Sequence, residues 1–536
     1  GMTPVLPAFG GYVPKAFAEK HPEARIYRMR AWEGFHETWW LDPADPLFAK
    51  LAGRFLDLYT EVYGAGTHYL ADAFNEMLPP VAQDPRAAAN SSYGDATANA
   101  EAAAKLDPAL KAQRLADYGA ALYASVAQAR PGAVWVMQGW LFGADKAFWD
   151  AESIAAFLSR VPDEKMMILD IGNDRYPDVW TRAEAFRGKN WIYGYVHNYG
   201  GSNPVYGDLG FYRDDLSALT RRDDTGKLSG FGVFPEGLDT NSIVYEYLYN
   251  LAWGDGGDSQ DAWLRVYLRA RYGCPPSPGL MQAWKTLVKA AYQTRYWTPR
   301  WWKSRAGAYL FFKRPTLDAV DFGEIPGDHH ALGQAVDALI LCADDLKDNY
   351  LFVFDLIEAV RHYVSGEIDG RIEAAIRACA SGDLARLDAL DQAIGDLALR
   401  LDALLGHQPD TLTSWTKAAR DYGDAPQDKA AYVENARAQI TVWGGSGNLN
   451  DYASKAWQGM YASFYLPRWR RFFDALRQSA ATKTAFDQDA FTAAIIAWEH
   501  DWVKSDAGEG LSRPADPVGD ARTLMRMTRT EQGVIL

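Results

Sequence analysis

The sequence has little cysteine, no excess of positive charge and no long apolar run. Its three cysteines, Cys274, Cys342 and Cys379, lie far apart and form no CxxC pair, so neither a disulfide framework nor a zinc site is expected. No stretch approaches the roughly 18 consecutive apolar residues that a membrane-spanning helix requires. The formal net charge of −14 disfavours a general nucleic-acid-binding surface.

Several catalytic motifs are also missing from the chain. There is no GxSxG, no P-loop and no HExxH, and no GxGxxG follows the first apolar run. The last absence disfavours a dinucleotide-binding fold. The pair His329-His330 stands alone, so we expect it in a surface loop rather than in a metal site.

Aromatic residues are the component that the sequence has in excess, with 20 Trp, 29 Tyr and 23 Phe. The overall composition, with 48% hydrophobic and 23% charged residues, is that of an ordinary globular protein. Many of the rings must lie in the core. A surplus of rings is also typical of carbohydrate-handling proteins, because the C–H face of a pyranose packs flat on an aromatic ring.

Residues 1–255 alternate short apolar runs with stretches that carry apolar residues at helical spacing, such as 45–63 and 150–160. This alternation predicts a parallel sheet with helices outside it. The runs end in polar or glycine-rich sequence, which favours a TIM-like (β/α) barrel over an open doubly wound sheet. A complete barrel needs eight strands, and the sequence supplies about six: residues 4–9, 68–76, 133–140, 166–170, 191–198 and 230–236.

The sequence changes character after a glycine- and aspartate-rich segment, 254–258. Leucine and alanine then recur at i, i+3 and i+4 in successive segments, which predicts amphipathic helices. The expected helices are residues 331–345, 350–364, 370–380 and 384–405, and no strand is expected after residue 260. We therefore predict two domains: a (β/α) barrel over residues 1–255 and an all-α domain over residues 256–536.

The first candidate catalytic residue is Glu76, which ends the run 68–76 just before a Pro-Pro pair. Prolines stop a sheet, so Glu76 is expected at the C-terminal mouth of the barrel, where barrel enzymes place their catalytic groups. Strand alternation puts Asp72 and Glu76 on one face and Asn75 on the other, so Asn75 joins the same site only if the strand end bulges or twists. A solvated carboxylate at a strand end fits the pattern equally well.

The second candidate is Glu236, which ends the run 230–236 and is followed by Gly237. A helix is expected directly after it, with Asp239 or Thr240 as its N-cap. A simple turn residue is the alternative interpretation of Glu236. Two glutamates at two strand ends are the minimum equipment of a glycosidase, with one proton donor and one nucleophile or base.

Four further side chains are candidates for binding. Trp140 follows Gln138-Gly139 at a strand end, and His197 closes another strand before a glycine pair, although a lone histidine is more often structural. Trp32 is either a stacking platform or a core residue. Trp443 ends a predicted helix in a glycine-rich loop, and it either contributes to the pocket or packs between domains.

At these positions the chain resembles the α-N-acetylglucosaminidase family, glycoside hydrolase family 89. The matching stretches keep their order and span nearly the whole chain. They are GMTPVLPAF (1–9), LDP (41–43), DAFNEM (72–77), VMQGWLF (136–142), HNYGG (197–201), PEG (235–237), WG (443–444) and NDYA (450–453).

The resemblance implies a small N-terminal α/β domain, a TIM barrel and a C-terminal all-α domain. It implies retaining hydrolysis of terminal α-linked N-acetylglucosamine in glycans, with no metal ion and no organic cofactor. Glu76 matches the general acid/base of the family and Glu236 matches its nucleophile. The pocket positions of the family are matched by Asn75, Trp140, His197 and Trp443.

The chain departs from the family at its front. The family places its N-terminal domain and two barrel strands ahead of the GMTPVLPAF stretch, and this chain starts inside that stretch, which accounts for six strands. No charged segment followed by an apolar segment opens the chain, so no signal peptide is visible. The resemblance implies a secreted, periplasmic or lysosome-like setting.

Two other functions are compatible with the same residues. A sugar-binding protein without turnover is favoured by the missing strands and disfavoured by the presence of both glutamates. A barrel glycosidase of different specificity, such as a β-hexosaminidase, is the second alternative. The expected partner is a carbohydrate substrate in each case, while the aglycone and the oligomeric state stay open.

Overall fold

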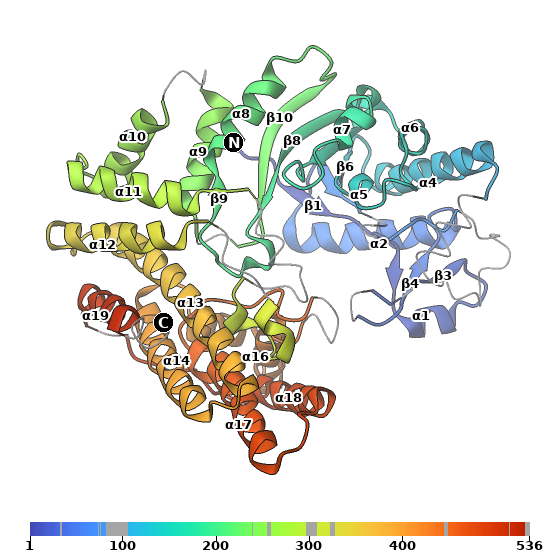
Figure 1. Ribbon diagram of the computed structural model, residues 1–536. Coiled ribbons are helices and arrows are strands. Elements are labelled where there is room, and N and C mark those ends of the chain that lie inside the picture. Colours follow the sequence, from blue (N-terminus) through green and yellow to red (C-terminus); the bar gives the residue numbers. More distant parts are fainter. Residues whose placement is uncertain are drawn as a thin grey trace. The chain divides into compact units, whose positions relative to one another are not determined.

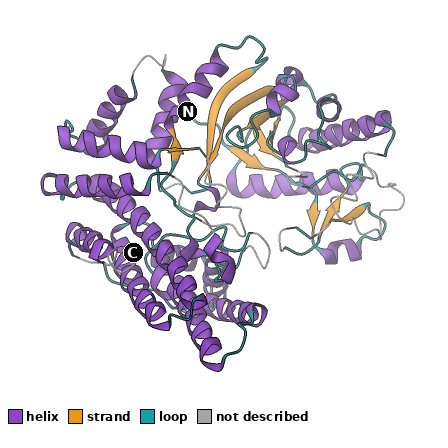
Figure 2. Ribbon diagram, viewed as in Figure 1, coloured by secondary structure: helices purple, strands orange, loops and turns teal. Residues whose placement is uncertain are grey.

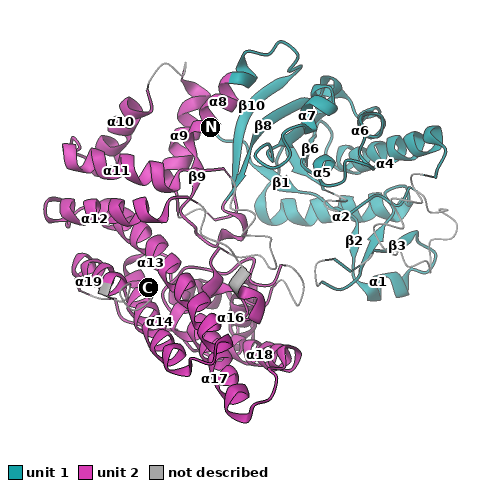
Figure 3. Ribbon diagram, in the orientation of Figure 1, with its two compact units in different colours: residues 1–197, 218–234 teal, residues 198–217, 235–536 magenta. Residues whose placement is uncertain are grey.

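The structure is a computed structural model, and it divides into two compact units, which Figure 3 colours separately. Unit 1 comprises residues 1–197 and 218–234, and unit 2 comprises residues 198–217 and 235–536. The domain boundary predicted between residues 255 and 256 stays a prediction. The described residues are 1–29, 31–32, 35–72, 74, 77–81, 105–237, 240–254, 259–295, 308–321, 327–443, 449–513 and 515–530.

A six-stranded sheet forms the centre of unit 1 (Figures 1 and 2). Its strands follow in the order β1-β5-β6-β7-β8-β10, and the pairs from β1 to β8 are parallel. The predicted parallel sheet of six strands is therefore confirmed for the described residues, with β1 and β10 at its two ends. The strands are β1 (Val5–Pro7), β5 (His68–Leu70), β6 (Val134–Gln138), β7 (Met166–Asp170), β8 (Asn190–His197) and β10 (Leu228–Pro235).

Helices cover this sheet, and the signals that start them are local. In α2 the Asp45 side chain accepts a hydrogen bond of 2.9 Å from the Leu47 N–H, and Pro46 occupies the first turn, where its missing N–H costs nothing. The buried cluster of Leu56, Tyr69, Val126 and Ala133 joins α2 and α4 to the sheet beside β5 and β6. The helices of unit 1 are α1 (Lys15–Lys20), α2 (Pro46–Tyr63), α4 (Pro108–Ala129), α5 (Leu141–Ala144), α6 (Ala151–Leu158) and α7 (Val179–Arg182), while α8 (Leu209–Thr220) begins in unit 2 and ends in unit 1.

Unit 1 also contains a small antiparallel sheet that the sequence analysis missed. Its strands are β2 (Tyr12–Val13), β3 (Ile26–Met29) and β4 (Thr38–Leu41), in the order β2-β4-β3. Strands of two to four residues are too short to show a period-2 pattern. Trp40 of β4 is fully buried, and its ring lies 4.9 Å from that of Phe74, so this sheet extends the core of unit 1.

Unit 2 is almost wholly helical, as predicted, with α13 packed against α14 and α19, and α11 against α12. One exception is a short antiparallel pair, β9 (Gly207–Asp208) with β11 (Gln293–Thr294). The prediction of no strand after residue 260 is therefore wrong, because two residues leave no pattern in a sequence. The helices are α9 (Ser242–Trp253), α10 (Gln260–Tyr272), α11 (Pro278–Ala291), α12 (His329–Leu346), α13 (Tyr350–Ala380), α14 (Leu384–Leu404), α15 (Leu412–Tyr422), α16 (Pro426–Gln439), α17 (Leu466–Thr482), α18 (Gln488–Val503) and α19 (Pro517–Thr530).

Two predictions in this half, one of a helix break and one of a surface loop, need correction. The segments 350–364 and 370–380 form one continuous helix, α13, because Gly370 is tolerated inside it. His329 begins α12 rather than lying in a loop. Its ring stacks on Tyr363 at 4.7 Å, and its Nε2 lies 3.0 Å from a carboxylate oxygen of Glu367. This histidine therefore packs helix against helix.

Candidate active site

The structure places only part of the predicted site among the described residues. Glu76 and Asn75 lie outside them, so the predicted carboxyl separation between Glu76 and Glu236 stays a prediction. Strand β5 ends at Leu70, so strand alternation does not extend to Asp72, and that part of the prediction is wrong. Trp32, Trp140 and His197 belong to unit 1, and Glu236 and Trp443 belong to unit 2.

Glu236 follows the last residue of β10, as predicted, and its side chain is exposed. One carboxylate oxygen, Oε2, accepts two hydrogen bonds. The Gly200 N–H donates over 2.6 Å, and the Tyr452 hydroxyl donates over 2.5 Å. Two donors on one oxygen fix the orientation of the carboxylate, and no hydrogen bond reaches Oε1 from the described part of the chain.

The Gly200 donor belongs to a tight turn over residues 198–201. Asn198, Gly200 and Gly201 all have left-handed backbone, with φ of 58°, 66° and 65°. A Cβ atom on Gly200 would lie 1.8 Å from the Tyr452 carbonyl oxygen, so only glycine fits there. The predicted glycine pair therefore allows the segment that carries Tyr452 to lie directly on this turn.

The Asn198 side chain connects this turn to the backbone that follows Glu236. Its Nδ2 donates to the Gly237 carbonyl and to the Thr240 hydroxyl, each over 3.3 Å. Its Oδ1 accepts from the Asn203 N–H over 3.1 Å. One amide thus holds the turn to the segment that follows Glu236.

The helix after Glu236 does not begin as predicted. The N-cap of α9 is Asn241, and its side chain makes no capping hydrogen bond. Instead Oδ1 accepts from the Tyr206 N–H over 3.2 Å and Nδ2 donates to the Pro204 carbonyl over 2.8 Å. Thr240 therefore is not the cap, and Asp239 lies outside the described residues.

A buried ionic cluster fixes the segment that carries Tyr452. The neighbouring Asp451 has a left-handed backbone, with φ of 62°. Its carboxylate accepts from the Arg468 guanidinium and from the Arg314 N–H, both over 2.8 Å. Both arginines also bind Glu499. Breaking such a buried cluster is costly, because it leaves an uncompensated charge. The cluster therefore fixes the backbone at Asp451 and, with it, the position of the neighbouring Tyr452.

Lys455 binds the same turn through two backbone carbonyls. Its Nζ donates to the Gly200 carbonyl over 2.6 Å and to the Gly201 carbonyl over 3.0 Å. Burial lowers the pKa of Lys455 to about 8, and the carboxylates of Glu236 and Asp410 act against this shift. The sequence analysis missed Tyr452, Lys455 and Asn198 as site residues, although the matched stretches HNYGG and NDYA contain two of them.

Trp443 is 39% exposed, and its ring centre lies 5.7 Å from that of Tyr452. This is compatible with the predicted pocket role, which stays a prediction.

In unit 1 a chain of hydrogen bonds orients Trp140. Its indole N–H donates to Gln138 Oε1 over 2.8 Å, and Gln138 Nε2 donates to the Asp72 carboxylate over 2.7 Å. The Trp140 ring also stacks on Tyr176, with 6.4 Å between ring centres and 9° between planes. Burial raises the pKa of Asp72. Trp140 is therefore a fixed, partly exposed ring at the end of β6.

The other two unit 1 candidates differ in exposure. His197 is only 1% exposed at the end of β8. Trp32 is half-buried, and its ring is stacked with that of Phe35 at 6.1 Å. Both stay predicted binding residues.

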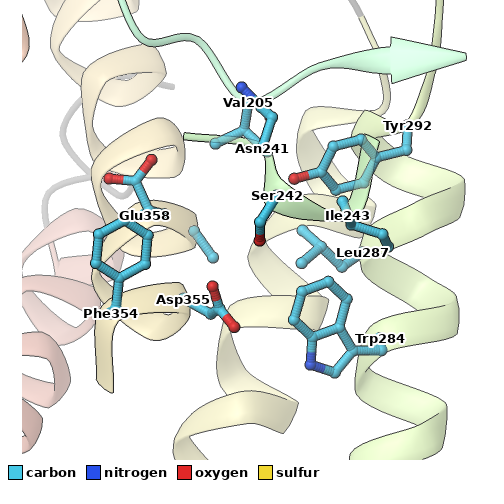
Figure 4. A pocket seen from close by; sticks show the side chains of 11 residues that line it. Val205, Asn241, Ser242, Ile243, Trp284, Leu287, Tyr292, Phe354, Asp355 and Glu358 are labelled. Carbon is cyan, nitrogen blue, oxygen red and sulfur yellow. The ribbon is translucent and has the colours of Figure 1, made fainter. Parts of the chain in front are cut away.

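A small internal pocket in unit 2 is not an alternative binding site for a sugar. Its volume is about 20 Å³, and Figure 4 shows Ser242, Asp355, Trp284 and Glu358 among its lining residues. That volume suits about one water molecule and is far too small for a sugar. Its acidic groups are already paired, Asp355 with Arg271 and Glu358 with a neighbouring arginine, although burial still raises the pKa of Glu358 to about 7.

Two features are absent from the described residues. These residues contain no group of three or more His, Cys, Asp or Glu side chains placed to hold a metal ion. Across the same residues, no helix has the length and apolar character needed to cross a membrane.

Comparison with known proteins gives matches to one family along the chain. Residues 1–255 match the alpha-N-acetylglucosaminidase (NAGLU) TIM-barrel domain, and residues 263–527 match the NAGLU C-terminal domain. The human protein alpha-N-acetylglucosaminidase is 30% identical over 536 residues, which cover 98% of this chain and 66% of the human protein. This chain therefore spans a little under two thirds of that relative.

Solved structures show the same fold. CpGH89 from Clostridium perfringens, in complex with its substrate GlcNAc-alpha-1,4-galactose, superposes with a TM-score of 0.78 at 22% identity. A family 89 glycoside hydrolase from Clostridium perfringens, in complex with 2-acetamido-1,2-dideoxynojirmycin, gives a TM-score of 0.77 at 23% identity. The matches cover 100% and 98% of this chain but 58% and 57% of those chains.

Proposed function

We propose that this chain, which belongs to the α-N-acetylglucosaminidase family, hydrolyses terminal α-linked N-acetylglucosamine from glycans with retention of configuration. The observation that carries the proposal is the setting of Glu236. It stands at the end of β10 with one oxygen held by the Gly200 N–H and the Tyr452 hydroxyl. Strand ends of this kind are where barrel enzymes place catalytic groups.

Glu236 is the proposed nucleophile, because the α linkage demands one from the protein. A nucleophile must approach the anomeric carbon from the face opposite the leaving group. The 2-acetamido oxygen of an α-linked sugar reaches the anomeric carbon only from the face of the leaving group, so the substrate cannot assist itself. A carboxylate of the protein must therefore form the glycosyl-enzyme intermediate.

Glu76 is the proposed general acid/base. It would start protonated, donate its proton to the leaving oxygen, and then accept a proton from the incoming water. We expect the carboxyl groups of Glu76 and Glu236 to lie about 5–5.5 Å apart, the spacing of retaining enzymes.

The proposed pocket uses the aromatic and polar residues that match the family. Asn75, Trp140, His197 and Trp443 would contact the sugar, and Trp32 is proposed as a stacking ring. The fixed orientation of Trp140 by Gln138 supports this, because a preorganised ring binds a sugar face without losing rotamer freedom. By relation to the family, we propose a secreted, periplasmic or lysosome-like setting.

The test is hydrolysis of 4-nitrophenyl N-acetyl-α- and β-glucosaminides, with NMR of the first sugar that forms. We expect turnover of the α anomer alone, and α-N-acetylglucosamine as the first product. Turnover of the β anomer would indicate another hexosaminide specificity. The β product appearing first from the α substrate would mean inversion, and the roles given to the two glutamates would be wrong.

A further inference from the structure

We infer that Lys455 is a positioning residue for Glu236 and that it acts through the backbone turn of residues 198–201. This inference rests on the proposed function, in which Glu236 is the nucleophile. Lys455 itself makes no hydrogen bond to Glu236 within the described residues. It binds the carbonyls of Gly200 and Gly201, so it holds the two peptide groups that directly follow the one whose N–H, that of Gly200, donates to the carboxylate.

The ammonium and the carboxylate bind consecutive peptide groups of one turn. Lys455 Nζ lies 2.6 Å from the Gly200 carbonyl oxygen and 3.0 Å from that of Gly201. The N–H of the same Gly200 donates to Glu236 Oε2 over 2.6 Å. Two carbonyl dipoles that converge on one point repel each other, and a cation between them removes this repulsion.

The turn needs the Lys455 ammonium to stay ordered, because its backbone can adopt many conformations. Two of its residues are glycine, and glycine loses more conformational freedom on ordering than any other residue. Lys455 packs closely on this turn, since a Cβ atom on Gly201 would lie 2.5 Å from Nζ. Without the ammonium, the Gly200 N–H would no longer be held in line with the carboxylate.

Lys455 is itself rigidly placed. The Tyr465 hydroxyl accepts from the Lys455 N–H and donates to the Lys455 carbonyl, both over 2.9 Å. Tyr465 ends a short π-helix, residues 461–465, an element that occurs frequently at functional sites. The backbone of Lys455 is thus fixed from the helical part of unit 2.

The charged groups that face Lys455 are the carboxylates of Glu236 and Asp410, and the Trp457 ring lies 5.9 Å from Nζ. Both carboxylates favour the ammonium form, whereas burial favours the neutral amine and lowers the pKa of Lys455 to about 8. The Lys455 amine is therefore charged in acidic and neutral solution and loses its charge above about pH 8.

The test compares Lys455→Met and Lys455→Arg with the parent chain, and Lys417→Met serves as a matched control. Lys417 is exposed, and among the described residues its ion pair is with Asp421 one helical turn away. We expect Lys455→Met to lower kcat on the nitrophenyl α-glucosaminide by about 10²-fold, the order of losing one preorganised donor. KM and the affinity for free N-acetylglucosamine should change less than threefold, and Lys417→Met should match the parent.

Lys455→Arg tests the pH dependence of kcat, which would not change if Lys455 had a purely structural role. It keeps a cation at the turn at every accessible pH, so it should retain at least a tenth of the parent kcat. It should also lose the part of the decline in kcat that the parent shows above about pH 8. This comparison keeps the inference testable if Lys455→Met does not fold, which near-UV circular dichroism detects.

Three outcomes would overturn the inference. They are parent-level kcat in folded Lys455→Met, a loss that falls wholly in KM, and an alkaline decline that is identical in Lys455→Arg and the parent. The proposed function fails differently, since the parent chain would then leave the α-glucosaminide intact or retain activity when Glu236 is replaced.

Discussion

Asp170, the last residue of β7, is buried in a way that makes unit 1 sensitive to pH. It is 0% exposed, and neither of its carboxylate oxygens accepts a hydrogen bond from the described part of the chain. Burial raises the pKa of Asp170 from 3.8 to about 8, and Asp178 adds to the shift. Asn173 and Arg182 oppose this rise in the pKa of Asp170. Asn173 Oδ1 is also buried without a hydrogen-bond partner among the described residues.

The sign of the effect on stability follows from which state binds the proton more tightly. The folded chain does, so the contribution of Asp170 is fully present below pH 3.8 and is lost as pH rises toward 8. With about 1.36 kcal/mol for each pKa unit, protonation of this group on folding costs about 4 kcal/mol at pH 7. The substitution Asp170→Asn keeps the shape and cannot ionise.

We therefore expect Asp170→Asn to stabilise unit 1 by up to about 4 kcal/mol at pH 7 and by little at pH 4. The measurement is the urea midpoint, followed by near-UV circular dichroism, of parent and variant at four pH values between 4 and 9. Asp178→Asn is the control. Asp178 is partly exposed, binds Lys146, and its pKa is lowered, so its replacement should give no gain that grows with pH.

The reasoning would be refuted by a stability difference between Asp170→Asn and the parent that is the same at every pH. A variant less stable than the parent at pH 7 would also refute it, because the buried carboxyl group would then have a partner that favours its ionised form.

The remaining predictions concern the turn and the nucleophile. Glu236→Ala should lower kcat by roughly 10⁴-fold or more, and azide should restore turnover with a product of inverted configuration, visible by NMR. Tyr452→Phe removes one of the two donors to Glu236 and should lower kcat about 10- to 10²-fold at unchanged thermal midpoint. Gly200→Ala places a Cβ atom 1.8 Å from the Tyr452 carbonyl and should lower both thermal midpoint and activity, whereas Gly53→Ala in α2, where nothing lies within 4 Å, should not.

Local patterns of the sequence were sufficient to predict the strands of the central sheet and several of the long helices. The run 166–170 is strand β7, and the helix expected over 45–63 begins with the Asp45 cap and Pro46 of α2. Glu236 lies at the end of a strand, as expected from the Pro-Glu-Gly sequence. Such features depend on residues near in sequence, because alternation, caps and proline act over one or two turns.

Strands shorter than one repeat of the hydrophobic pattern, and helix caps that bind distant backbone, could not be predicted. Strand pairs of two residues, such as Gly207–Asp208 with Gln293–Thr294, carry no periodic signal. The cap of α9 was misassigned because Asn241 uses its amide on Tyr206 and Pro204 instead of on its own helix. A sequence pattern cannot reveal that a distant backbone competes for the same side chain.

The sequence by itself determined the two carboxylates, the aromatic surplus, the sheet and the helical half that mark this chain as a family member. Only the tertiary structure decided what surrounds Glu236. Tyr452 lies 216 residues from Glu236, and Lys455 lies 255 residues from Gly200. A hydrogen bond between segments so far apart depends on where the folded chain brings them together, and burial such as that of Asp170 depends on all the layers packed around one residue. Neither leaves a local pattern, since each is a property of packing rather than of neighbouring residues.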